Sequence, residues 1–368
     1  MEKYYIATIS AAKFIGSATI QKLIDYFGDA KSVWTSKFDD LMDAGLNKNA
    51  FDSIIRFREK NPDGPEKLMD YCSRKKINLC SIVDEDYPPI LKEIKLPPAV
   101  FYYYGKLQPF ADRIAMVGTR DNTSYGRDAA LKISEELASA GITIVSGAAR
   151  GIDTFSHIGA LKSGRTVAVL GCGMNFAFDT PNRNLLKRII DNGVIMTDYP
   201  PNQRPSTETF PSRNRIIAAL SHGVIVVEAG KKSGAIITSN YAGDYGRDVF
   251  AVPGNIFQEK SKGCHKLIRD GAILVTCADD ILEFYNVTRE KKSRSDEKSE
   301  SDIIKSESVK LKGIEKKIFD VIPSGDFISV DEILIEVEDI SPDEINSVLL
   351  NLEMKNYIVE SDGNYSRA

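Results

Sequence analysis

The stretch IAMVGTRDNTSYGRDAALKISEELASAGITIVSGAARGID, residues 114–153, decides the fold class of this chain. It begins with a short apolar run, continues through a segment whose apolar residues recur at helical spacing, and ends in a second apolar run. A strand, a helix and a second strand in this order are typical of neighbouring parallel strands joined by a crossover helix. Glycine follows each apolar run directly, so both strands are predicted to end in tight turns.

The same alternation continues as far as residue 276. Amphipathic segments of roughly ten to fifteen residues separate the apolar runs, which is typical of crossover helices. The alternation predicts an α/β fold with a doubly wound, mostly parallel sheet, and the unbroken apolar character of the runs predicts strands that are buried on both faces. The predicted strands lie at 114–118, 142–147, 166–171, 194–199, 223–229, 248–254 and 272–276.

Residues 1–75 are predicted to form a helical N-terminal domain. FIGSATIQKLIDYFG (14–28) and GLNKNAFDSIIRFREK (45–60) have helical apolar spacing and are bounded by glycines. The second helix begins like half of a helix-hairpin-helix, or SAM-like, motif, although a plain helical packing unit explains the same pattern. Residues 84–109 are rich in Pro and Tyr and are predicted to be an extended connector. Its tyrosines at 102–104 fit a half-buried strand better than a base-stacking strip.

The C-terminal part is predicted to be a separate acidic unit. Residues 287–311 are a Ser-rich, mixed-charge stretch typical of a flexible linker. Residues 312–368 predict helices at about 313–322, 330–337 and 342–355, followed by a hairpin, an order that suggests a winged helix. This unit carries 13 acidic and 5 basic residues. A DNA-reading helix needs basic side chains, so a protein-contact or regulatory module is favoured over a sequence-specific repressor.

Composition excludes several classes of protein. The 368 residues are 42% hydrophobic and 27% charged, an ordinary globular mixture. The net charge is −4, but residues 312–368 alone account for −8, which leaves +4 for the rest of the chain. No apolar run is long enough to span a bilayer. Scattered cysteines without a CxxC pair indicate a reducing cytoplasm, and the dispersed histidines indicate neither a metal site nor a cofactor.

Glycine-rich turns follow four of the predicted strands. In an open parallel sheet, ligands bind beyond the carboxyl ends of the strands, where backbone amides and helix N-termini hold anions. The clustering of such turns therefore predicts an anionic ligand, rather than tight connections alone. The candidate residues in these turns are Gly118, Thr119, Arg120, Gly147, Arg150, Gly151, Gly171, Gly173, Lys231, Lys232, Ser233 and Gly234.

Motif spacing argues against two common anionic ligands. The turn that begins at Gly171 lacks the third glycine of the dinucleotide fingerprint, and Ile225 stands where a P-loop would need its first glycine. Arginine beside an aromatic ring is instead the combination that single-stranded nucleic acid requires, since one group holds phosphate and the other stacks on a base. The residues that supply it at this edge are Arg120, Arg150, Arg183, Phe210, Arg213, Asn214 and Arg215.

Several of these stretches together resemble the DNA processing protein A family, also called Smf. The matching segments are MVGTR (116–120), SGAARGID (146–153), 209–217, RDVFAVPG (247–254) and LIRDGA (267–272). The resemblance implies a Rossmann-like domain over residues 76–286 that binds and protects single-stranded DNA. It also implies help in loading a RecA-type recombinase, notably in natural transformation, and self-association as a homodimer. Two departures are Thr180, where the family usually has Tyr before Pro, and Glu208, in a stretch without lysine.

A second interpretation is an enzyme or a nucleotide sensor. The same broad fold includes phosphoribohydrolases that cleave nucleoside monophosphates, and Glu228 at a strand end would be the acid/base residue. The run IITS (236–239) replaces the acid usually found on the following helix, so single-stranded DNA binding without catalysis is favoured.

Overall fold

The computed structural model describes residues 1–107, 112–287, 313–323, 328–337, 340–354, 357–361 and 364–367. The chain forms two compact units, Met1–Glu290 and Lys291–Ala368. Apart from Val287, the predicted linker at 287–311 lies outside the described residues.

The first unit is built around a nine-stranded sheet in the order β1-β2-β6-β5-β4-β3-β7-β8-β9. From β6 to β9 all neighbours are parallel, which confirms the doubly wound sheet expected from the alternating pattern. Each predicted apolar run overlaps one strand of this part. The strands are β3 (Arg113–Val117), β4 (Thr143–Ser146), β5 (Thr166–Val169), β6 (Val194–Thr197), β7 (Gly223–Val226), β8 (Asp248–Ala251) and β9 (Ile273–Leu274).

Two antiparallel strands extend the sheet beyond β6. β2 (Val100–Gly105) pairs with β6, and β1 (Asn78–Ser81) pairs with β2. The connector predicted at 84–109 is therefore only partly extended chain, because residues 100–105 form the strand β2 and the short helix α7 (Pro89–Lys92) precedes it. Tyr102 is fully buried in β2. A base-stacking role for this tyrosine is therefore wrong.

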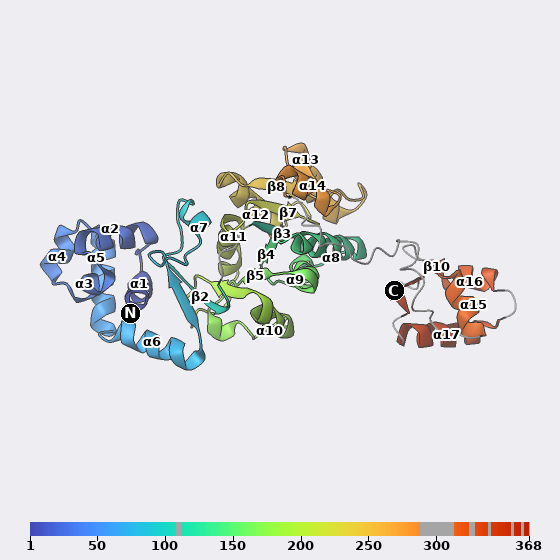
Figure 1. The fold of residues 1–368 in the computed structure, drawn as a ribbon, viewed down its shortest axis with the longest axis horizontal. Coiled ribbons are helices and arrows are strands. Elements are labelled where there is room, and N and C mark those ends of the chain that lie inside the picture. Colours follow the sequence, from blue (N-terminus) through green and yellow to red (C-terminus); the bar gives the residue numbers. More distant parts are fainter. Residues whose placement is uncertain are drawn as a thin grey trace, which may run out of the picture. The chain divides into compact units, whose positions relative to one another are not determined.

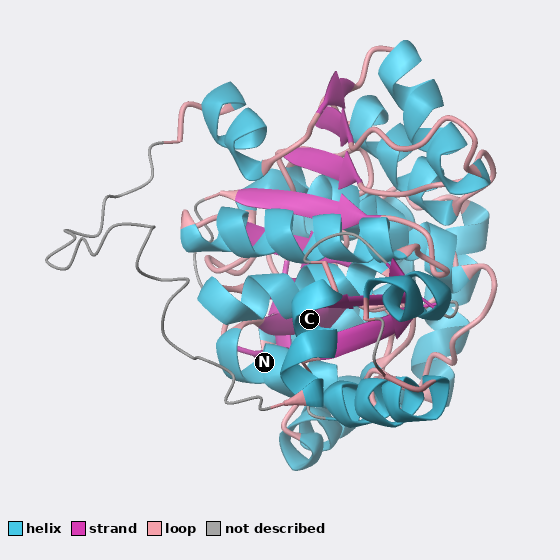
Figure 2. Ribbon diagram, turned by 90° about the vertical axis from the view of Figure 1, so that its right-hand side faces the viewer, coloured by secondary structure: helices cyan, strands magenta, loops and turns pink. Residues whose placement is uncertain are grey.

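Helices cover both faces of the sheet (Figure 2). The side chains of β3 alternate, so that Ile114 and Met116 pack against α8 and α9 while Ala115 and Val117 pack against α11 and α12. The first face is covered by α8 (Ser124–Ser139), α9 (Ile152–Ser163), α10 (Arg183–Asn192) and α14 (Ala278–Phe284). The second face is covered by α11 (Thr209–Ala219), α12 (Gly234–Asp244) and α13 (Lys262–Arg269).

The N-terminal helices share a hydrophobic core with the β1–β2 end of the sheet (Figure 1). Gly28 ends the first predicted helix at a φ of 90°, and Gly45, at a φ of 71°, lies in the turn before the second. The helices are α1 (Glu2–Ser10), α2 (Ser17–Phe27), α3 (Ala30–Thr35), α4 (Phe38–Asp43), α5 (Lys48–Lys60) and α6 (Gly64–Lys75).

The described residues of the second unit form three helices and a small antiparallel sheet. Ile318, Ile333 and Leu349, one from each helix, are buried in its core. The helices are α15 (Ile314–Val321), α16 (Val330–Glu336) and α17 (Pro342–Met354), and the strands β10 (Ile328–Ser329), β11 (Ile358–Ser361) and β12 (Asn364–Arg367) are in the order β10-β12-β11. The winged helix remains a prediction for this unit.

Candidate nucleic-acid interface

The strand order reverses between β3 and β7. β3 lies between β4, the next strand in sequence, and β7, so the chain leaves the carboxyl ends of β3 and β7 in opposite directions. Such a switch point opens a crevice outside the sheet, where ligands of open α/β proteins bind. Gly118, Thr119 and Arg120 follow β3 directly, and the 227–233 segment follows β7.

Two adjacent hollows lie at this edge. The first hollow, of about 430 Å³, is formed by the first turns of α11 and α12 and includes Phe210, Ser233 and Gly234 in its wall. The second hollow, of about 270 Å³, lies over the turns after β4 and β5 and also includes Phe210. Arg120 lines both hollows. The edge therefore offers two sites side by side, with a shared arginine and a shared aromatic ring.

Phe210 and Arg120 are in contact. The guanidinium carbon of Arg120 lies 5.2 Å from the centre of the Phe210 ring, a cation–π arrangement. The ring is half-buried and rests on Gly171, where a Cβ atom would approach ring atom Cδ1 to 2.7 Å. Because only glycine permits this approach, the turn after β5 fixes the ring at the edge of the sheet.

Arg213, a predicted DNA contact, lines both hollows but is buried, and much of its guanidinium is engaged within the protein. Its Nη1 donates to the carbonyl oxygens of Gly147, at 2.7 Å, and of Val169. Burial lowers the pKa of Arg213, while the nearby Asp153 carboxylate opposes that shift. The guanidinium therefore joins α11 to the ends of β4 and β5, and it positions the Phe210 side of that helix.

Arg215, another predicted DNA contact, is also held within the protein. Its guanidinium forms an ion pair with Asp198 and donates to the carbonyl oxygen of Leu96 at 2.8 Å. Burial raises the pKa of Asp198, and Arg215 partly offsets that rise. This pair connects α11 to the chain after β6.

Several turn amides that were predicted to hold an anion are used inside the protein. The Asp153 carboxylate accepts from the amides of Gly147 and Ala149 at 3.2 and 3.3 Å. The amide of Gly173 donates to the carbonyl oxygen of Gln203. Gly151, at a φ of 88°, is buried against the carbonyl oxygen of Thr119. These glycines build the floor of the edge, since their neighbours approach too closely for a side chain.

The first turns of α11 and α12 remain open toward the first hollow. Ser233 caps α12 by accepting from the amide of Ala235 at 3.3 Å, and Gly234 is exposed. Asn214 lines the same hollow and donates to the carbonyl oxygen of Gly234. Helix N-termini beside an arginine favour an anion, so the first hollow suits a phosphate group.

Exposed cations surround the two hollows. Sequence reasoning missed one of them, Arg204, whose guanidinium carbon lies 5.4 Å from the centre of the Phe176 ring. Its position in the connection between β6 and α11, at the same edge as Phe210, was the signal available. The predicted site residues that are exposed here as cations are Arg120, Arg150, Arg183, Lys231 and Lys232.

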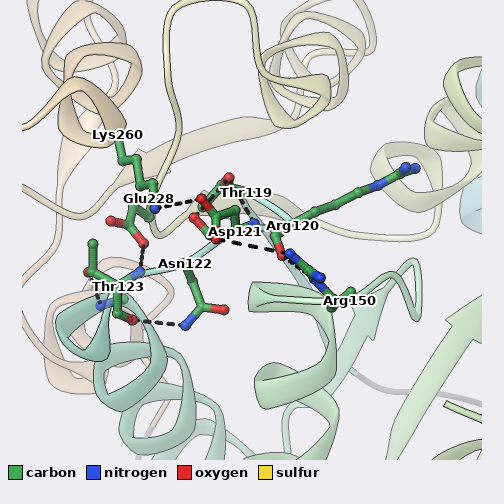
Figure 3. A network of polar contacts seen from close by, with 9 residues as sticks. Thr119, Arg120, Asp121, Asn122, Thr123, Arg150, Glu228 and Lys260 are labelled. Carbon is green, nitrogen blue, oxygen red and sulfur yellow. Dashed lines mark hydrogen bonds and ion pairs between the residues drawn. The ribbon is translucent and has the colours of Figure 1, made fainter. Parts of the chain in front are cut away.

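A network of polar contacts joins the turn after β3 to its neighbours (Figure 3). Asp121 lies 2.9 Å from the ammonium of Lys260 and 4.0 Å from the guanidinium of Arg150. The hydrogen bond and charge of Lys260 lower the pKa of Asp121. Arg150 also donates to the carbonyl oxygen of Arg120 at 3.1 Å. The Asp121 carboxylate thus pairs with two cations of the edge, Lys260 and Arg150.

Glu228 binds the N-terminus of α8 and lies in the wall of neither hollow as described. Its buried carboxylate accepts from the amide of Thr123 at 2.9 Å, and its carbonyl oxygen accepts from the amide of Thr119. Within the described residues, the walls of the two hollows do not include Glu228. A carboxylate at a helix N-terminus is stabilising, which explains its position without catalysis.

The described residues lack both a metal-binding cluster and a membrane-spanning helix. No group of three or more His, Cys, Asp or Glu side chains there is placed to hold a metal ion. In the same ranges, no helix has the length and apolar character needed to cross a bilayer.

Known proteins share both the sequence and the fold. Protein Smf of Synechocystis is 36% identical over 288 residues, which are 76% of this chain and 72% of the relative. DNA processing protein DprA of Streptococcus pneumoniae is 42% identical over 204 residues, 55% of this chain and 72% of that protein. The X-ray structure of the pneumococcal protein has a TM-score of 0.67 and 34% identity, covering 77% of this chain and 98% of that one.

A second solved structure concerns the single-stranded DNA binding mode of DNA processing protein A from Helicobacter pylori. It has a TM-score of 0.52 and 27% identity, and it covers 57% of this chain and 96% of its own. The family model for DNA recombination-mediator protein A matches residues 78–286, which include the whole sheet and both hollows. This chain therefore belongs to the DNA recombination-mediator protein A family.

Proposed function

We propose that this chain binds single-stranded DNA along the carboxyl edge of its sheet and acts in DNA processing. The observation that carries the proposal is the Arg120–Phe210 pair, which lies between two hollows at the strand switch point. The H. pylori relative, whose structure concerns single-stranded DNA binding, supports the same ligand.

The residues around the two hollows suit two different parts of a nucleotide, its phosphate and its base. The first has helix N-termini and Arg120 in its wall, and is suited to a phosphate. The Phe210 ring, or the Arg120 plane lying over it, offers a stacking surface for a base. The faces of the bases are accessible only when the strand is unpaired, so single strands are favoured over duplex.

The position of Glu228 favours binding over hydrolysis. A general acid or base must reach the reacting atom, but this carboxylate is engaged with the amide of Thr123. We therefore expect no release of free base when the purified protein is incubated with nucleoside monophosphates. Turnover that disappears in Glu228→Gln would instead support the phosphoribohydrolase interpretation.

The proposal includes two partners, a RecA-type recombinase and a second copy of this chain. The description of the family as a recombination mediator supports the first. We expect the protein to accelerate assembly of recombinase on strands already covered by a single-strand-binding protein. We also expect a dimer in sedimentation equilibrium. A monomer at all accessible concentrations, or no effect on recombinase assembly, would contradict the corresponding partner.

The deciding experiment is a titration of labelled dT oligonucleotide and of matched duplex at two salt concentrations. Binding should favour the single strand, and each phosphate contact should contribute about −0.7 to the log–log salt slope. Lys162→Ala is the matched control, since it removes a cation from the last turn of α9, at the amino end of the sheet. A flat slope, tighter binding to duplex, or equal losses in Arg120→Ala and Lys162→Ala would overturn the proposal.

A further inference from the structure

We propose that the second hollow holds one nucleobase and that Asp179 selects guanine there. This inference rests on the proposed function, because it concerns a base of the bound strand. The inference adds a base preference to the proposed site. The other groups at this edge are suited to phosphate or to the face of any base, so they do not distinguish one base from another.

The walls of the second hollow suit a flat apolar ring. Leu170, Ala177, Pro181, Leu186 and Phe210 all line it. Its volume of about 270 Å³ lies just below the range of pockets that take drug-sized ligands, roughly 300–1,000 Å³, as expected for a fragment such as one base. Arg120 lines the same hollow, so a base inside would lie close to a cation that can hold its own phosphate.

Asp179 is the unusual member of this wall. It is exposed, and in the described part of the chain its carboxylate has neither a hydrogen-bond nor an ion-pair partner. The amide of Asp179 donates to the carbonyl oxygen of Phe176 at 3.1 Å, which ties the residue to the helical turn η1 (Met174–Phe176). A free carboxylate repels phosphate, so beside exposed arginines it weakens backbone binding unless it serves another part of the strand.

The chemistry of an ionised carboxylate decides which base it prefers. Its two oxygens only accept hydrogen bonds, and they accept best from two adjacent donors. Guanine presents its N1–H and its 2-amino group side by side. Adenine and cytosine present one amino group next to an acceptor nitrogen, and thymine presents one N–H between two carbonyls. Guanine alone therefore satisfies both oxygens without placing a lone pair against them.

The preference is measurable with a single guanine in a dT oligonucleotide, which cannot form a quadruplex. The probes are dT12 and the same strand with one central dG, dA, dC, deoxyinosine or 7-deaza-dG, each competing with labelled dT12. The dG strand should bind about five- to twentyfold more tightly than dT12, in the lower range for a bidentate base contact because Asp179 is exposed. Deoxyinosine lacks the 2-amino group and should lose most of this gain, whereas 7-deaza-dG should keep it.

Two variants assign the preference to one carboxylate. In Asp179→Asn one acceptor becomes a donor, so the ratio of dG-strand to dT12 affinity should fall to about one. Asp191→Asn is the control, since Asp191 is exposed near the end of α10 and is absent from the hollow's wall as described. Binding of dT12 without a guanine preference, or a preference that survives Asp179→Asn, would overturn the inference alone. Failure to bind dT12 would overturn the proposed function as well.

Discussion

Arg120 and Phe210 touch each other, so substitutions at the two positions do not act independently. Their contact has the geometry of a cation–π pair, and the ring rests on a glycine that holds it in place. Groups in direct contact couple by about 0.5–3 kcal/mol, whereas distant sites add. We therefore expect the Arg120 guanidinium and the Phe210 ring to contribute jointly to one contact with the ligand.

A double-mutant cycle on this pair measures the coupling. Phe210→Ala should weaken binding of dT12 by about 1–3 kcal/mol through lost stacking, with the salt slope unchanged. Arg120→Ala should weaken binding and flatten the slope by about 0.7, one phosphate contact. The double variant should lose less than the sum of the two. Additive losses, or a lower melting temperature with unchanged affinity in Phe210→Ala, would show that the ring only packs.

Asp121 limits the charge that the edge offers to a ligand. It pairs with Lys260 and Arg150, both of which lie beside the turn after β3. Asp121→Asn should tighten binding by up to about tenfold at low salt and steepen the salt slope by up to about one, because two cations are released. Glu135→Gln, which removes an exposed carboxylate paired with Lys162, should change neither quantity. Equal effects of both variants would indicate a general charge effect.

At the scale of elements, His157 joins α9 to the sheet. Its Nδ1 lies 2.6 Å from the hydroxyl of Thr166, and that hydroxyl donates to the carbonyl oxygen of Ile144 at 2.7 Å. Since the only hydroxyl hydrogen points to Ile144, Nδ1 must carry a hydrogen and donate. Burial lowers the pKa of His157 to about 3. The folded protein therefore keeps this ring neutral far below its ordinary titration range.

This burial predicts a loss of stability in mild acid. Between about pH 6.5 and 3 the unfolded chain takes up a proton at His157 that the folded chain does not, so stability falls as pH falls. From pH 7 to 5 the loss should be about 2 kcal/mol greater than in His157→Asn, which keeps a donor for Thr166 and does not titrate. Urea unfolding of both proteins at the two pH values measures the difference. Parallel losses would show that the histidine already binds a proton in the native state.

Local sequence predicted some elements better than others. The parallel strands were predictable because their apolar runs are continuous and alternate with amphipathic segments, and glycine-rich turns follow four of them. β2 was predicted only as a half-buried strand at its tyrosines, within a connector read as extended chain, since Pro97 and Pro98 precede it and tyrosines suit both a strand and an exposed surface. At the site, Phe210 was predicted at the edge. The burial of Arg213 was not predictable, because the carbonyls that accept from it come from segments more than forty residues away in sequence.

For the whole molecule, charge is divided between the two units. Residues 312–368, within the second unit, carry 13 acidic and 5 basic residues, whereas both hollows belong to the first. A chain ending at Glu290 should keep its affinity for dT12 within about tenfold, and bind slightly more tightly at low salt. The gain should vanish at high salt, where such long-range repulsion is screened. A larger loss in a truncated chain with an unchanged melting temperature would show that the second unit contacts DNA directly.

The place of β3 in the sheet also sets an order of events during synthesis. Its partner β4 emerges from the ribosome about 30 residues later, but β7, on its other side, follows only after about 110 residues. At roughly 5–20 residues per second the nascent chain exposes this apolar strand edge for about 5–20 s. An unpaired edge of this kind is a template for aggregation. The strand at the centre of the parallel part of the mature sheet is thus an edge strand for a time, and chaperone binding is expected to matter most while residues 118–222 are being translated.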